Sequence, residues 1–111
     1  MRDAVVIGAG LAGLAASIRL AQRGAQVTLV TKGIGGLQLG QGTIDALGYA
    51  PELVERPLDA ITQLTVEHPT HPYARLGASS VAQSLEWIRE LLGPERLLGS
   101  ADTNVRIPTA L

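Results

Sequence analysis

Three glycines near the start of the chain have a spacing that suits contact with a dinucleotide. They stand in Gly8-Ala-Gly10-Leu-Ala-Gly13, which is the pattern G-x-G-x-x-G. The first glycine permits a tight turn, the second lets backbone approach a pyrophosphate, and the third lets a helix pack close to a sheet. The first helical residues, Leu11 and Ala12, offer unpaired N–H groups and a partial positive charge to phosphates. We therefore predict that this segment contacts a pyrophosphate.

The residues around this motif predict the elements that must position it. The apolar run Asp3–Ile7 is typical of a strand buried on both faces of a parallel sheet. Apolar residues recur at helical spacing over Leu11–Arg23, and Gly24 provides a left-handed stop. Gln26–Val30 indicates a second strand, parallel to the first because a helix separates them. Residues 1–32 are therefore expected to form a Rossmann-like β-α-β unit of α/β class.

The position after the second strand differs from the usual dinucleotide-binding pattern. An Asp or Glu normally stands there and binds the ribose hydroxyls. This chain has Thr31 and Lys32 instead. A threonine can still hydrogen-bond a ribose and a lysine can meet a phosphate, so NADP and a phosphate-ended flavin both remain open. A solvated lysine after a strand is the alternative.

A glycine-rich segment follows, and residues 33–48 are expected to form a loop. Gly33–Gly42 has five glycines in ten residues, which argues against regular structure. Backbone donors without side chains suit a phosphate or a flat ring. A plain surface connection is the competing interpretation.

Residues 49–111 are expected to form a helical insertion followed by the start of another strand. Pro57–Val66 has a proline at a first helical position and is expected to end near His68. Ser80–Gln83 has the capping-box pattern of a second helix, which Gly93 would stop. A strand start is expected at residues 105–107. With 111 residues, the chain is too short to complete both a cofactor domain and a substrate domain, so we expect an incomplete sheet.

Composition excludes several classes of function. The formal charge is −1 and no basic stripe is present, so nucleic acid is not an expected partner. The absence of cysteine removes disulfides and thiolate metal sites and suits a cytoplasmic protein. The apolar stretch of residues 4–21 is better explained by a strand and a helix than by a signal peptide or membrane span. No metal site is expected.

Beyond these patterns, the chain resembles a known family. Val5–Leu14 and Val30–Gly33 are similar to the N-terminal end of two-dinucleotide-binding-domain flavoproteins of the fumarate reductase and succinate dehydrogenase type. Three further stretches resemble, in the same order, the B subunits of anaerobic glycerol-3-phosphate dehydrogenases: Gly40–Asp45, His71–Gly77, and Gly99–Asn104 followed by Pro108–Leu111. Members of that family are several times longer, so the resemblance implies an N-terminal fragment or a truncated product.

The resemblance implies a flavin, FAD or FMN, in a subunit of a complex that oxidises sn-glycerol 3-phosphate to dihydroxyacetone phosphate. Electrons would pass toward the quinone pool. Other subunits of the complex would carry the main FAD chemistry, the iron–sulfur clusters and the membrane contact. This chain would then be cytoplasmic, at the inner face of the membrane only through a partner subunit, and not active alone.

Carried over onto this sequence, the family pattern implies three groups of cofactor-binding residues. One contacts the pyrophosphate, one lies near the ribose or phosphate end, and one approaches the flavin. They are, in that order, Gly8, Gly10 and Gly13; Thr31 and Lys32; and Gly40, Gly42 and Thr43.

His71, Tyr73 and Arg75 are the weaker candidates for catalysis. An imidazole can act as a general base toward a secondary alcohol, and a guanidinium can hold a substrate phosphate. However, a proline follows each of the two histidines, which favours an ordinary extended loop from His68 to Tyr73. Two histidines alone also make a poor metal site. The catalytic base is therefore not identified from the sequence.

Two other functions remain open from the residues alone. One is an NAD(P)-dependent Rossmann oxidoreductase, which the missing acidic residue and the glycine-rich loop disfavour. The other is a nucleotide-binding or assembly module without chemistry of its own, because a sheet with only its early strands lacks a substrate half.

Overall fold

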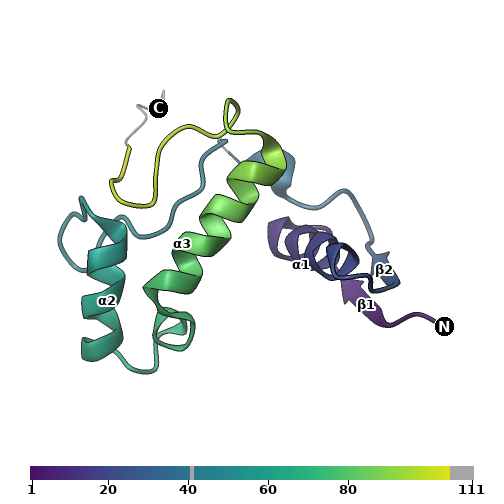
Figure 1. Cartoon of the computed structure of the whole chain (residues 1–111), viewed down its shortest axis with the longest axis horizontal. Helices are drawn as coiled ribbons and strands as arrows, with labels where there is room; N and C mark the ends of the chain where they lie inside the picture. Colours follow the sequence, from purple (N-terminus) through teal and green to yellow (C-terminus); the bar gives the residue numbers. More distant parts are fainter. Residues whose placement is uncertain (41, 106–111) are drawn as a thin grey trace. The chain divides into compact units, whose positions relative to one another are not determined.

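The computed structural model describes residues 1–40 and 42–105 (Figure 1). The chain divides into two compact units, Met1–Thr43 and Ile44–Leu111, and each is described by itself. The first unit contains β1 (Ala4–Ile7), α1 (Leu11–Gln22), β2 (Val27–Val30) and the 3₁₀ helix η1 (Leu37–Leu39), and the second contains α2 (Pro57–Glu67) and α3 (Pro72–Leu92).

The first unit is a β-α-β unit. β1 and β2 pair in parallel, with Ala4 opposite Val27 and Ile7 opposite Val30. α1 packs on both strands (Figure 1). The chain leaves α1 through Gly24, which has the left-handed φ of 87°. The α/β class, the parallel pairing and the stop at Gly24 are thus confirmed.

The burial of β1 differs from the prediction. Val6 lies on the face toward α1 and is half-buried, whereas Val5 and Ile7 are 62% and 86% exposed. Successive side chains of a strand point to opposite faces, and among the described residues α1 covers only one face of the pair. The prediction of burial on both faces is therefore wrong for this strand.

The glycine-rich segment contains one turn of helix where no regular structure was expected. The N–H of Leu39 donates to the Gly36 carbonyl at 3.0 Å, and that of Gly40 donates to the Leu37 carbonyl at 3.1 Å. These two i→i+3 bonds define η1. All residues from 31 to 40 remain exposed.

The second unit is built on a helical hairpin. α2 begins at Pro57, as predicted, and ends at Glu67, and it packs against α3 (Figure 1). Ile61 of α2 is fully buried, and Val81 of α3 is also buried. The core of this unit therefore lies between the two helices and is aliphatic, as the composition predicts.

α3 begins earlier than predicted. It starts at Pro72 rather than at Ser80, because the Nδ1 of His71 accepts a backbone N–H bond and caps the first turn. Gly77, at φ 75° and ψ 155°, then kinks the helix. Because Gly77 is non-helical, α3 consists of two helical segments joined at this residue. A helical segment near Ser80 is thus present as predicted, but it begins directly after Gly77, and Ser80 lies within its first turn rather than at its N-cap. The predicted end at Gly93 is confirmed.

A single asparagine ties the last described residues to the rest of the second unit. The Nδ2 of Asn104 donates to the carbonyls of Leu47 and Val54, both at 2.8 Å. These bonds hold two segments together that lie at least 50 residues apart in the chain. The strand expected at 105–107 is not tested, since Val105 belongs to no described strand and the other two residues lie outside the described part.

The apolar stretch of residues 4–21 is divided between β1 and α1, as predicted. Across residues 1–40 and 42–105, no helix combines the length and the apolar character that crossing a membrane requires.

The buried position of Ile61 gives a test of the helical hairpin. Ile61→Ala should lower the free energy of unfolding by about 2–5 kcal/mol, because it leaves a cavity between α2 and α3. Val66→Ala is the matched control, since Val66 lies on the same helix and is 80% exposed. It should change stability by less than about 0.5 kcal/mol. Urea denaturation measures both, and equal losses would contradict this core.

Candidate dinucleotide-binding site

The turn between β1 and α1 continues the pairing of the sheet. The N–H of Gly8 donates to the Val30 carbonyl at 2.8 Å, one residue beyond the end of β1. Gly8 then takes a φ of 102°, which a side chain would disfavour, and the chain turns into α1. The first helical bond follows, from the N–H of Leu14 to the carbonyl of Gly10 at 3.0 Å. The strand end therefore leads directly into the helix.

Gly13 brings the first turn of α1 against the end of β1. A Cβ at Gly13 would overlap the carbonyl oxygen of Gly8 and would lie 3.6 Å from the Cγ1 of Val6. Only a residue without a side chain permits this approach. The packing role predicted for Gly13 is thus present, while its contact with a pyrophosphate stays a prediction.

The start of α1 is free to receive an anion. Gly10 is the N-cap residue and has no side chain to satisfy the helix, and the first turn contains no acidic residue. A Cβ at Gly10 would meet no atom within 4 Å, so the space beside it is open. Leu11 and Ala12 are exposed. Open space, unpaired N–H groups and a positive helix end together fit a dinucleotide pyrophosphate.

The charge of the first unit favours the same ligand. Its one acidic side chain, Asp3, precedes β1 at the opposite end of the sheet from the turn, and its Oδ2 accepts the Gln26 N–H at 2.8 Å. The basic side chains of the unit are Arg2, Arg19, Arg23 and Lys32. Arg2 precedes β1 and Arg19 and Arg23 lie at the C-terminal end of α1, so the positive charge at the turn itself comes from Lys32, which follows β2, and from the N-terminal end of α1.

Thr31 and Lys32 differ in whether the polar group of the side chain already has a partner within the chain. The Oγ1 of Thr31 accepts the Gly33 N–H at 3.2 Å and also donates to the Gly33 carbonyl. Its hydroxyl is therefore used in the turn that opens the glycine-rich segment. Lys32 is exposed and forms no ion pair within the described residues. The predicted ribose and phosphate contacts of both residues stay predictions.

Gly35 is a residue of this site that the sequence analysis missed. It has a φ of 75°, and a Cβ there would overlap the carbonyl of Ala9 and lie 3.0 Å from the nitrogen of Gly10. The glycine-rich segment therefore touches the β1–α1 turn at Gly35. The sequence analysis placed Gly35 and Gly36 in a glycine-rich loop, but no sequence pattern predicted the contact of Gly35 with Ala9.

Gly40, Gly42 and Thr43 lie further along the same unit and are exposed. Gly42 has a φ of 80° and open space beside it, and the one neighbour of a Cβ at Gly40 would be the carbonyl of Leu37. Gln41, between them, lies outside the described residues. The approach of this segment to a flavin stays a prediction.

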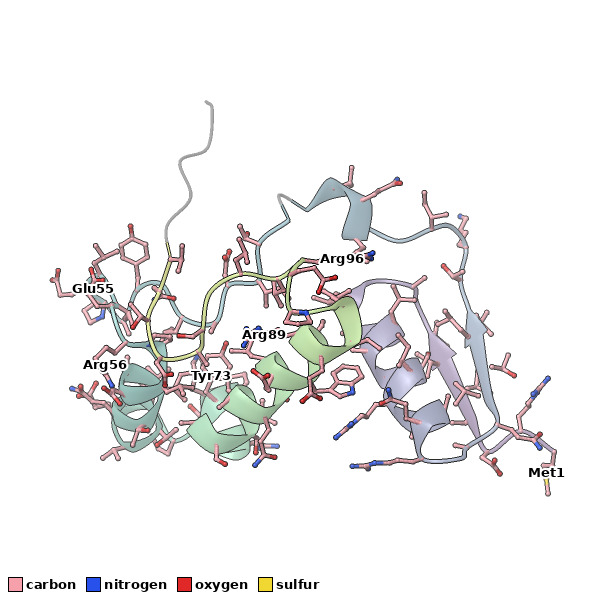
Figure 2. All side chains as sticks on the ribbon, turned by 45° about the horizontal axis from the view of Figure 1, so that its top comes forward. Met1, Glu55, Arg56, Tyr73, Arg89 and Arg96 are labelled. Carbon is pink, nitrogen blue, oxygen red and sulfur yellow. The ribbon has the colours of Figure 1, made fainter. Side chains whose placement is uncertain are left out.

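The candidate catalytic residues lie in the second unit, on or next to the first turn of α3. Figure 2 labels one of them, Tyr73. The Nδ1 of His71 accepts the Tyr73 N–H at 3.1 Å, and the Tyr73 hydroxyl donates to the Ala46 carbonyl at 2.5 Å. The expected extended loop from His68 to Tyr73 is wrong, because the chain turns after His68 and α3 begins before Tyr73. His71 and Tyr73 thus have structural contacts, Arg75 is exposed, and their catalytic role stays untested.

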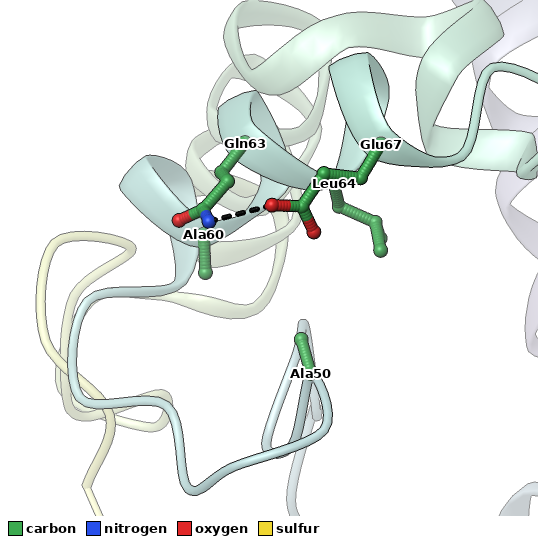
Figure 3. Close-up of a pocket in the computed structure, with 5 residues that line it drawn as sticks. All are labelled: Ala50, Ala60, Gln63, Leu64 and Glu67. Atoms are coloured by element: carbon green, nitrogen blue, oxygen red, sulfur yellow. Dashed lines mark hydrogen bonds between the residues drawn. The ribbon is translucent and has the colours of Figure 1, made fainter.

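Residues of α2 and of the segment before it line two depressions of the second unit. At one of them, the Nε2 of Gln63 donates to the Oε1 of Glu67 at 2.7 Å (Figure 3). At the other, a hydrogen bond and the charge of Asp59 raise the pKa of the Arg56 guanidinium. No predicted cofactor residue lines either.

The β-α-β unit with its glycine turn defines a dinucleotide-binding protein, and comparison with known families gives its class. Residues 3–108 match the family model of the FAD binding domain. The chain therefore belongs to the FAD-binding domain family. This match supports the FAD prediction, whereas binding of FMN stays a prediction.

The individual relatives are B subunits of anaerobic glycerol-3-phosphate dehydrogenase. The subunit of Pectobacterium atrosepticum is 41% identical over 106 residues, which cover 92% of this chain and 25% of the relative. That of Vibrio cholerae is 37% identical over 92 residues, which cover 81% of this chain and 21% of the relative. The chain thus spans about a quarter of the length of these relatives. The resemblance inferred from the sequence is confirmed. No solved structure matches the chain.

Two glycine substitutions separate ligand contact from packing. Gly10→Ala should cost less than about 1 kcal/mol of stability, since its Cβ meets open space, yet weaken FAD binding at least about tenfold by filling that space. Gly13→Ala should lower stability by about 1–3 kcal/mol, because its Cβ overlaps the Gly8 carbonyl.

Thermal unfolding and flavin fluorescence titration on the same samples measure the two effects. If Gly10→Ala bound FAD like the unsubstituted chain, the open space beside Gly10 would not be the ligand site.

Proposed function

We propose that this chain is the FAD-binding segment of a B-type subunit of an anaerobic glycerol-3-phosphate dehydrogenase. The complete enzyme would oxidise sn-glycerol 3-phosphate to dihydroxyacetone phosphate. The observation that carries the proposal is the 41% identity to such a subunit over 92% of this chain. The glycine turn supports it, because it offers an open, positively charged place for a cofactor pyrophosphate.

The part of the chemistry that belongs to this chain is cofactor binding. FAD, when bound, supplies a two-electron acceptor for the oxidation of a secondary alcohol to a ketone. The N–H groups at the start of α1 would hold the pyrophosphate, and the exposed Lys32 would lie near the ribose end. The described residues of the first unit include no histidine and no acidic side chain other than Asp3, so we assign the substrate half of the reaction to other parts of the complex.

Partners and location follow from the same assignment. The relatives are named as subunits, so this chain would work with other subunits of a complex. We propose that the complex passes electrons toward the quinone pool and that membrane contact is made by a partner subunit. The chain itself would lie in the cytoplasm, at the inner face of the membrane.

A chimera tests this proposal. This chain replaces the matching 106 residues of the Pectobacterium subunit, and the chimera is purified with its partner subunits. We expect the complex to contain flavin and its visible absorption to bleach when glycerol 3-phosphate is added without oxygen. Glycerol 1-phosphate of the opposite configuration and NADP⁺ are the control ligands.

The same chimera with Gly10→Ala should assemble with its partners but contain less flavin in the B subunit. Flavin that is present but never reduced by glycerol 3-phosphate would contradict the proposed substrate. Tight NADP⁺ binding without flavin would contradict the cofactor as well.

A further inference from the structure

We propose that Gly35 is a positioning residue that holds the glycine-rich segment against the dinucleotide-binding turn, so that both parts of the cofactor site are in place before the cofactor arrives. The inference rests on the proposed function only for the identity of the ligand. The contact itself lies within the first unit and is independent of any ligand.

The contact at Gly35 is made by backbone alone. A Cβ at Gly35 would overlap the carbonyl oxygen of Ala9, lie 2.6 Å from the carbon of that carbonyl, and lie 3.0 Å from the nitrogen of Gly10. Ala9 is itself buried. Any side chain at position 35 must therefore push the segment away from the turn.

Two neighbouring positions do not share this constraint. Gly36 has a φ of −92°, which any residue can adopt, and a Cβ there would meet nothing within 4 Å. Gly33 also has open space beside it. The close approach is thus specific to Gly35 and is not a general property of a loop rich in glycine.

Thr31 forms a second contact that orders the segment, shortly before Gly35 in the chain. Through its two bonds to Gly33, the hydroxyl of Thr31 fixes the direction in which the chain leaves β2. From there the chain reaches Ala9 at Gly35 and closes η1 at Leu37–Leu39. Thr31 therefore orders the start of the segment, and Gly35 places it against the turn.

This arrangement lowers the cost of binding. A loop that must be ordered by its ligand spends part of the binding free energy on that ordering, whereas a loop already in place does not. Loss of the Gly35 contact should therefore weaken FAD binding even though Gly35 need not touch FAD.

Three variants of the chain test the proposal. Gly35→Ala introduces the overlap. Gly36→Ala is the matched control next to it. Gly24→Ala controls for backbone strain, because Gly24 also has a left-handed φ of 87° but open space beside it, at the far end of α1.

Two measurements are made on each variant. Amide hydrogen exchange is followed at Leu39 and Gly40, whose N–H groups form the bonds of η1. FAD affinity is measured by quenching of flavin fluorescence. We expect Gly35→Ala to accelerate exchange at both amides and to weaken FAD binding by about tenfold. The two controls should stay within about twofold of the unsubstituted chain in affinity.

If Gly35→Ala exchanged and bound FAD like Gly36→Ala, the proposal would be wrong. Equal losses in Gly35→Ala and Gly24→Ala would also overturn it, because strain alone would explain them. If the unsubstituted chain bound no FAD, the proposed cofactor role would fail on its own, and the exchange rates would still decide the role of Gly35.

Discussion

The close contact between Gly13 and the carbonyl of Gly8 is the constraint on which the first unit depends. It sets the start of α1 directly on the end of β1, and the bond from Gly8 to Val30 aligns that end with β2. Because no side chain fills the space beside Gly10, the helix N-terminus opens onto a place where an anion can lie. One backbone contact therefore determines both the packing of the β-α-β unit and the geometry of the site.

Positive charge and backbone N–H groups both favour an anion at the glycine turn. The first unit has four basic side chains and one acidic side chain, and the acidic one lies at the opposite end of the sheet. Within the first unit, therefore, no carboxylate lies at the turn to compete with a phosphate. The glycine-rich segment lies against the turn at Gly35, and the hydroxyl of Thr31 accepts a hydrogen bond from Gly33 of that segment. Because this chain has no acidic residue directly after β2, we expect it to recognise its cofactor mainly through backbone N–H groups and positive charge.

The sequence predicted the first unit well because its signals are local. The spacing of Gly8, Gly10 and Gly13 predicts a tight turn, the start of a helix and a close contact between helix and strand. Non-local contacts left no such signal. The start of α3 depends on a cap from His71, and the exposure of Ile7 depends on which elements cover the sheet. The contact of Gly35 with Ala9 likewise joins residues about one β-α-β unit apart, which glycine content alone does not specify.

The central claim is that the glycine turn of this chain holds the pyrophosphate of FAD. Titration of the ¹⁵N-labelled chain with FAD, followed by amide chemical shifts, tests it most directly. The account predicts saturable shifts that are largest at the N–H groups of Leu11, Ala12 and Gly13. FAD binding whose largest shifts fall in α2 or α3, with the turn unchanged, would contradict it.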